Sequence, residues 1–105
     1  MIVRSAVLEG TVPEADRAQF DRHMAGPVLD AIRTYPGIMR VVLRRLVQAD
    51  EGSPAVYMVF DLYFDSVEAM DAALASPIRQ AVRQQIAQAM SLFQGRVYHQ
   101  VFRED

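Results

Sequence analysis

The clearest pattern of alternating apolar and polar residues lies between residues 55 and 64 and predicts a β-strand. Every second residue from 56 to 64 is apolar, whereas the positions between them are mixed: Tyr57, Val59, Asp61 and Tyr63. A period of two with one apolar face is typical of a strand that covers a core on one side. A carboxylate at Asp65, followed by Glu68 three residues later, predicts that a helix starts there.

The remaining periodicities predict three more strands and two helical regions. Gly10 is expected to end the first strand, and Gly95 to cap the last helix. An interior proline loses a backbone hydrogen bond and clashes with the preceding turn, so Gly26 and Pro27 predict a kink or break in the helix just after His23. The predicted strands cover residues 2–9, 38–48 and 96–102, and the helices cover 13–35 and 77–93, with a short helix after Asp65.

These elements follow in the order βαββαβ, which predicts an α+β, ferredoxin-like fold for a single domain of residues 1–105. Four antiparallel strands would form a sheet with the helices on one face. The other face carries apolar residues among charges, which is typical of a surface that binds a partner. A second copy of the chain is the simplest partner. The candidate residues of this homodimer interface are Arg40, Arg44, Tyr57, Val59, Asp61 and Tyr63.

Composition narrows the classes of function. The 105 residues are 51% hydrophobic and 23% charged, which is typical of a globular protein, and the net charge of −2 shows no positive excess. We therefore expect no nucleic-acid partner, and the apolar runs are too short to predict a membrane span. The absence of cysteine excludes a thiolate metal site and a cysteine nucleophile. The first residues show no signal-peptide pattern, so a cytoplasmic location is expected.

Three segments resemble the EthD-like proteins, a family named after a component of ethyl tert-butyl ether degradation. They read FDRHMAGPVLDAI (residues 20–32), YPGI (35–38) and LYFDSVEAMDAAL (62–74), and the likeness in length and element order covers nearly the whole chain. The resemblance implies a dimeric α/β barrel, in which two ferredoxin-like protomers join their sheets. That superfamily includes small monooxygenases, haem-degrading enzymes, lactone isomerases and polyketide cyclases.

Histidines are the main candidates for chemistry. Family members usually carry a histidine on the first helix shortly before a proline, and His23 matches it, although Pro27 lies four residues on instead of the usual two. An imidazole beside a helix break could act as a general acid or base in a cleft between helices and sheet; alternatively, it lies at the helix edge, bonded to a carbonyl. His99 on the last strand is the weaker candidate. The candidate pocket residues are Phe20, Met24, Tyr35 and Tyr98.

Two hypotheses for function stay open. The chain is either a small homodimeric enzyme or catabolic accessory protein that acts on a small apolar or aromatic molecule, or a non-catalytic ligand-binding or assembly module. The histidines lack metal-ligand spacing, and no glycine-rich phosphate loop is present, so neither a metal nor another cofactor is expected.

Overall fold

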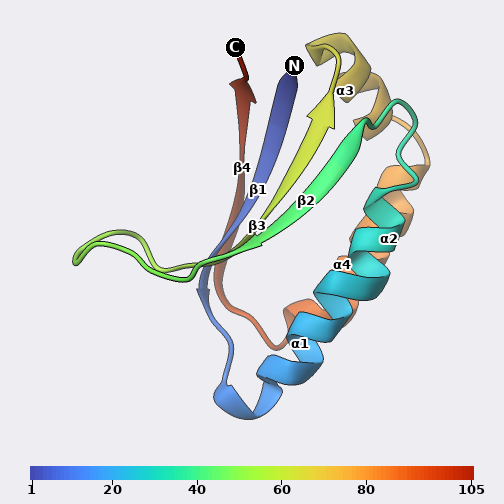
Figure 1. Ribbon diagram of the computed structural model, residues 1–105. Coiled ribbons are helices and arrows are strands. Elements are labelled where there is room, and N and C mark those ends of the chain that lie inside the picture. Colours follow the sequence, from blue (N-terminus) through green and yellow to red (C-terminus); the bar gives the residue numbers. More distant parts are fainter.

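Four antiparallel strands form one sheet, and the helices pack against one face of it (Figure 1). The computed structural model describes residues 1–105. The strand order is β2-β3-β1-β4, so the first strand lies in the middle, as the predicted ferredoxin-like fold requires. The predicted α+β, βαββαβ fold is thus confirmed. The strands are β1 (Ile2–Thr11), β2 (Arg40–Arg45), β3 (Val56–Phe64) and β4 (Gln94–Arg103).

The first helical region is continuous in space but changes its type, as the proline led us to expect. A 3-10 turn (η1, Glu14–Asp16) and α1 (Arg17–His23) are followed by a π-helical segment (η2, Met24–Val28) and by α2 (Leu29–Ile32). Pro27 lies inside the π-helical segment. A proline lacks the backbone amide that an α-helix needs, and the wider i to i+5 turns of a π-helix are one way in which a helix departs from α geometry at such a point. The irregularity predicted just after His23 is therefore present as a change from α-helix to π-helix, and the helix is not interrupted.

The second helical region consists of α3 (Val67–Leu74) and α4 (Ile78–Met90). The start of α3 differs from the prediction by one residue, because Ser66 and not Asp65 is the N-cap. Its hydroxyl accepts a hydrogen bond from the amide of Ala69 at 3.1 Å. A serine oxygen satisfies the free amide as well as a carboxylate does.

Gly10 and Gly95 do not end their elements as predicted. Both lie within strands, directly opposite each other in the β1–β4 pairing, with φ angles of 154° and 157°. A Cβ atom at Gly10 would lie 2.2 Å from the carbonyl oxygen of Gln94. The two glycines therefore let two long strands approach closely at a point where side chains would collide.

Tyr57 lies on the helix side of the sheet, so the prediction that it faces outward is wrong. A β-bulge causes the difference: Leu8 pairs with Met58 and Glu9 pairs with Val56, which leaves Tyr57 as the extra residue of β3. Its ring packs edge-on against Phe20, with 5.6 Å between ring centroids. Its hydroxyl donates a hydrogen bond to Asp21 Oδ1 on α1 at 2.6 Å.

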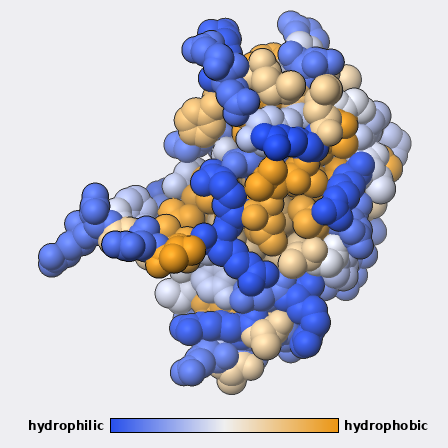
Figure 2. All heavy atoms as spheres, in the orientation of Figure 1, coloured by the Kyte–Doolittle hydropathy of each residue, from blue (hydrophilic) through white to orange (hydrophobic).

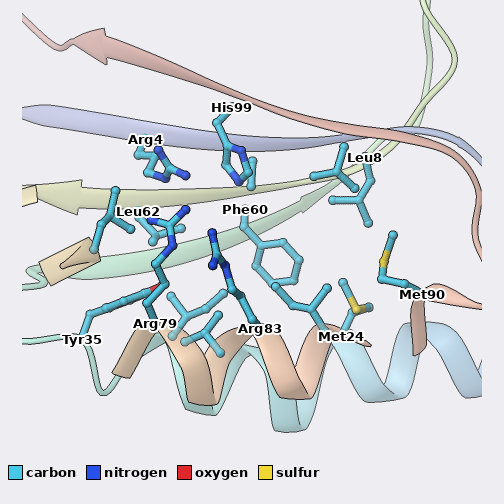
Figure 3. Close-up of a pocket in the computed structure, with 16 residues that line it drawn as sticks. Arg4, Leu8, Met24, Tyr35, Phe60, Leu62, Arg79, Arg83, Met90 and His99 are labelled. Carbon is cyan, nitrogen blue, oxygen red and sulfur yellow. The ribbon is translucent and has the colours of Figure 1, made fainter. Parts of the chain in front are cut away.

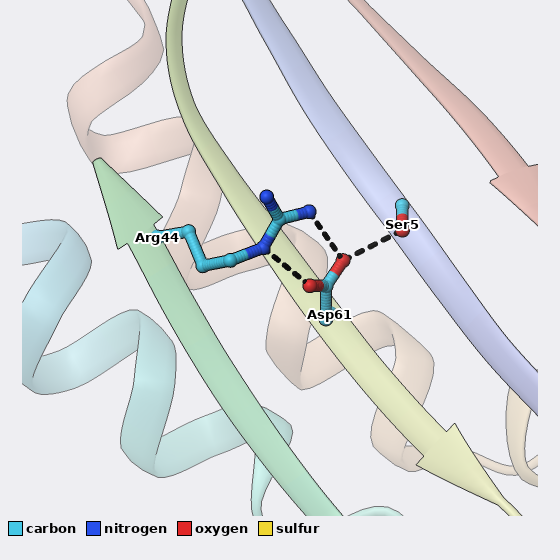
Figure 4. Close-up of polar contacts among 3 residues, drawn as sticks. All are labelled: Ser5, Arg44 and Asp61. Atoms are coloured by element: carbon cyan, nitrogen blue, oxygen red, sulfur yellow. Dashed lines mark hydrogen bonds and ion pairs between the residues drawn. The ribbon is translucent and has the colours of Figure 1, made fainter. Parts of the chain in front are cut away.

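The other predicted interface residues do share the outer face of the sheet. Asp61 is buried there and accepts hydrogen bonds from Ser5 Oγ at 2.6 Å and from Arg44 Nε at 2.6 Å (Figure 4). Asp61 and Arg44, two of the predicted interface residues, therefore pair with each other within the chain. The guanidinium of Arg40 lies over the ring of Tyr63, 4.2 Å from its centroid.

Candidate functional site

A cavity of about 300 Å³ lies between α4 and the inner face of the sheet (Figure 3). Twelve of its 16 lining residues are hydrophobic, which is typical of a site for a small organic molecule. The first helical region closes one side with Met24, Ile32 and Tyr35. The complete lining is Arg4, Ala6, Leu8, Met24, Ile32, Tyr35, Phe60, Leu62, Leu74, Arg79, Val82, Arg83, Ile86, Met90, Val97 and His99.

The periodicities of the strands and of α4 explain why these side chains meet. Alternate residues of β1 face the helices, and the register places Ala6 beside both Phe60 and His99. On α4 the lining positions 79, 82, 83, 86 and 90 recur at intervals of three and four, which is one face of a helix. The cavity is thus built almost entirely from regular elements, and Tyr35 alone lies outside them, in the turn that follows α2.

Polar side chains gather at one end of the cavity. Arg79 and Arg83 extend from α4 toward Arg4 and His99 on the sheet (Figure 3). In the same view Leu8, Met24 and Met90 lie at the opposite end, with Phe60 between the two groups. The cavity therefore has a cationic end and an apolar end.

The charges shift the pKa values of the groups around them. His99 is an exposed residue, but partial loss of hydration lowers its pKa, and the positive charges of Arg4, Arg79 and Arg83 lower it further. Burial raises the pKa of Tyr35 although the same arginines act in the opposite direction. Hence His99 and Tyr35 are both uncharged at neutral pH, and the arginines carry the only charges of the cavity.

His23 does not line this cavity. Its Nε2 atom lies 2.6 Å from the backbone oxygen of Gln85 on α4, so the ring joins two helices. This is the arrangement of the alternative given above, a histidine at a helix edge bonded to a carbonyl. The position of His23 thus lends no support to the prediction that it acts as an acid or base in the cleft.

Two of the four predicted pocket residues, Met24 and Tyr35, line the cavity. Phe20 is fully buried and stacks on Phe93, with 5.8 Å between ring centroids, and so belongs to the core. Tyr98 does not line the cavity, and the guanidinium of Arg96 lies over its ring, 5.0 Å from the centroid.

Sequence reasoning missed the arginines. Arg79 and Arg83 lie four residues apart and therefore on one side of α4, with no acidic residue at the neighbouring turn positions of that helix. Two arginines on one side of a helix, with no carboxylate beside them on that helix, were the sequence signal that could have identified them as site residues. Arg4 could not be added from sequence, because only the strand register brings it opposite α4.

The outer face of the sheet holds a second, shallower hollow of about 270 Å³. It is lined by the Ser5–Asp61–Arg44 network together with Tyr63 and Phe102. Asp61 has its pKa lowered: burial would raise it, but the hydrogen bonds from Arg44 and Ser5 have the larger combined effect. Three of the six predicted interface residues, Arg44, Asp61 and Tyr63, line this hollow.

Neither a metal site nor a membrane span is apparent in the structure. No group of three or more histidine and acidic side chains could hold a metal ion. None of the helices combines the length and apolar character that crossing a membrane requires.

Comparison by sequence identifies no relatives: no protein-family model and no curated protein matches the chain. Solved structures do match. An ethyl tert-butyl ether degradation (EthD) family protein from Bacillus halodurans aligns over 100% of both chains, with 23% identity and a TM-score of 0.77.

Two further matching structures are those of proteins whose names describe them as oxygenases. A Deinococcus radiodurans protein, provisionally described as an antibiotic biosynthesis monooxygenase, has 17% identity and a TM-score of 0.65 over 100% of this chain and 93% of its own. A cofactor-independent oxygenase from Streptomyces nogalater has 18% identity and a TM-score of 0.59 over 98% and 90%. The chain therefore has the fold shared by the EthD protein and these oxygenase-type proteins, and the resemblance indicated by its sequence segments is confirmed at the level of the fold.

Proposed function

We propose that the chain binds a small, largely apolar or aromatic molecule in the cavity between α4 and the sheet. The observation that carries this proposal is a cavity of about 300 Å³ with a mostly apolar lining and its polar groups at one end. Ligand sites generally combine an apolar wall with a few convergent polar groups, and about 300 Å³ is the lower end of their usual volume. The ligand is accordingly small.

If the chain is an enzyme, the side chains at the polar end of the cavity favour proton transfer as its reaction. His99 is uncharged at neutral pH because its pKa is lowered, so its imidazole can accept a proton from a bound molecule. The neighbouring guanidinium groups would stabilise the negative charge left behind. The names of two structural relatives, a monooxygenase and a cofactor-independent oxygenase, are compatible with chemistry on small organic molecules.

Pairing of two outer sheet faces is the second part of the proposal. Phe102 on this face is 51% exposed, whereas Val3, Val7 and Val59, which lie on the same face by register, are already buried within the chain. The connection between β2 and β3 projects away from the body (Figure 1), and it carries Val47 at 95% exposure. A second copy of the chain would cover this apolar surface.

The ligand proposal is tested by filling the cavity. Ala6 lines the cavity beside Phe60 and His99, so Ala6→Phe should weaken binding of the neutral probe 2-naphthylmethanol at least tenfold, measured by calorimetric titration. Ala87→Phe is the matched control, because Ala87 lies on the exposed side of α4 and does not line the cavity. Equal affinity in wild type and Ala6→Phe, with both variants folded by circular dichroism, would refute the proposal.

A further inference from the structure

The guanidinium groups at the cationic end of the cavity come from two elements far apart in the sequence. Arg4 lies on β1, whereas Arg79 and Arg83 lie one turn apart on α4. Figure 3 shows the side chains of Arg79 and Arg83 directed at Arg4 and His99 across the cavity. Three positive charges therefore converge at one end of an otherwise apolar space.

No group of the protein neutralises these charges by direct contact. The ion pairs of the structure use other arginines: Arg33 with Asp30, Arg44 with Asp61, Arg45 with Asp21 and Arg96 with Glu9. The cavity arginines take part in none of these pairs and in none of the side-chain hydrogen bonds, which involve Arg17, Arg33, Arg44 and Arg96. The donor capacity of three guanidinium groups, five N–H bonds each, is free to serve a ligand.

The environment of Arg4 shows that this arrangement is costly without an anion. Arg4 is half-buried, and its pKa is lowered by burial and by the charge of Arg79, with Tyr35 and Asp71 opposing the shift. Asp71 lies on α3 and makes no ion pair with Arg4. Loss of hydration and nearby like charges both raise the free energy of a charged group. A negatively charged ligand beside the group would offset that cost.

We propose that the ligand of the cavity is an amphipathic organic anion, whose carboxylate lies among Arg4, Arg79 and Arg83 while its apolar body lies on Leu8, Met24 and Met90. This inference rests on the proposed ligand-binding function and specifies the ligand class. Guanidinium groups match the planar geometry of a carboxylate and bind it with two parallel hydrogen bonds. The apolar end of the cavity then accommodates a ring or short chain away from water.

The test compares two probes of the same shape that differ in charge, 2-naphthoate and 2-naphthylmethanol. Wild-type protein should bind the naphthoate at least tenfold more tightly, and the naphthoate affinity alone should fall between 50 and 500 mM sodium chloride. The double variant Arg79→Gln/Arg83→Gln should lose the preference while it keeps its affinity for the alcohol. The control Arg22→Gln/Arg33→Gln removes the same charge from the first helical region, outside the cavity, and should retain the preference.

The outcomes separate the two proposals. If wild type binds both probes equally, or if Arg79→Gln/Arg83→Gln retains the preference for the naphthoate, the anion inference is overturned and the proposed apolar ligand site stands. If wild type binds neither probe, the proposed ligand site fails and the anion inference fails with it. Circular dichroism of each variant establishes that the fold is intact, and Arg83 is exposed, so its replacement removes little packing.

Discussion

Tyr57 shows how one inserted residue changes the role of a side chain. Simple alternation assigns it to the outer face with Val59 and Asp61, but the bulge in β3 turns it toward the helices. Nothing in the local sequence marks that bulge, since its position depends on how β1 and β3 pair. The residue consequently joins α1 to the sheet through its hydrogen bond to Asp21.

Replacement of Tyr57 by phenylalanine should reduce the loss of stability, measured as the free energy of unfolding, that occurs at alkaline pH. Burial raises the pKa of Tyr57 to about 12, and the hydrogen bond to Asp21 contributes to the same shift. The unfolded chain loses this proton near the usual pKa of about 10. Stability from Tyr57 is thus complete below about pH 10 and is lost as the pH rises toward 12.

Urea unfolding at pH 8, 10 and 11.5 measures this effect. The free energy of unfolding of wild type should fall between pH 10 and 11.5 by more than that of Tyr57→Phe. Tyr63→Phe is the control, because the hydroxyl of Tyr63 makes no hydrogen bond to another side chain. The same pH dependence in wild type and Tyr57→Phe would contradict the assigned role.

Element types were more predictable than element ends. Apolar periodicity located the strands and helices, because each element has one face on a common core. The ends depend on contacts between distant residues: β1 continues through Gly10 only because Gly95 lies opposite it. Likewise the proline predicted a kink or break after His23, but it did not predict that a π-helical segment would accommodate the proline while the helix continues.

Gly10 offers a direct test of the close strand approach. A Cβ at this position would meet the backbone of Gln94 and Gly95 at 2.2 and 2.8 Å. Gly10→Ala should therefore lower the free energy of unfolding by at least about 2 kcal/mol, from strain and overpacking together. Chemical denaturation provides the measurement.

Gly26→Ala is the matched control for this substitution. Gly26 lies in the π-helical segment, where an added Cβ would meet no atom of another element within 4 Å. Its replacement should leave stability unchanged or raise it by up to about 1 kcal/mol, since alanine reduces the freedom of the unfolded chain. Equal losses at Gly10 and Gly26 would mean that the β1–β4 approach is not the cause.

At the scale of the whole molecule, apolar surface remains outside the helix–sheet core. Figure 2 shows apolar atoms gathered between β2 and the helices, with charged side chains around them. Ile38, Val41 and Leu43 are half-buried against the core. The outer sheet face adds Phe102, and from sequence alone its mixed pattern already indicated a partner surface.

If two chains associate through their outer sheet faces, Phe102→Glu should weaken that association. The glutamate would have to lose its hydration within the interface, which is unfavourable without a cationic partner. Light scattering after size exclusion at micromolar concentration should show a dimer for wild type and a larger monomer fraction for Phe102→Glu. Gln84→Glu on the exposed side of α4 should remain dimeric. A wild type that is monomeric throughout would contradict the proposed dimer.

A cleft between the helices and the sheet was predicted from sequence, but most of its lining was not, because it combines residues from β1, β3, β4, the first helical region, α3 and α4. Ligand binding in this cavity is the central claim, and the methionines allow a direct measurement. Met24 and Met90 line the cavity, whereas Met1 and Met39 are exposed elsewhere. In protein labelled with ¹³C at the methionine methyls, titration with 2-naphthoate should shift the Met24 and Met90 resonances and leave those of Met1 and Met39 in place. Shifts confined to Met1 and Met39, or no shifts at all, would contradict the account.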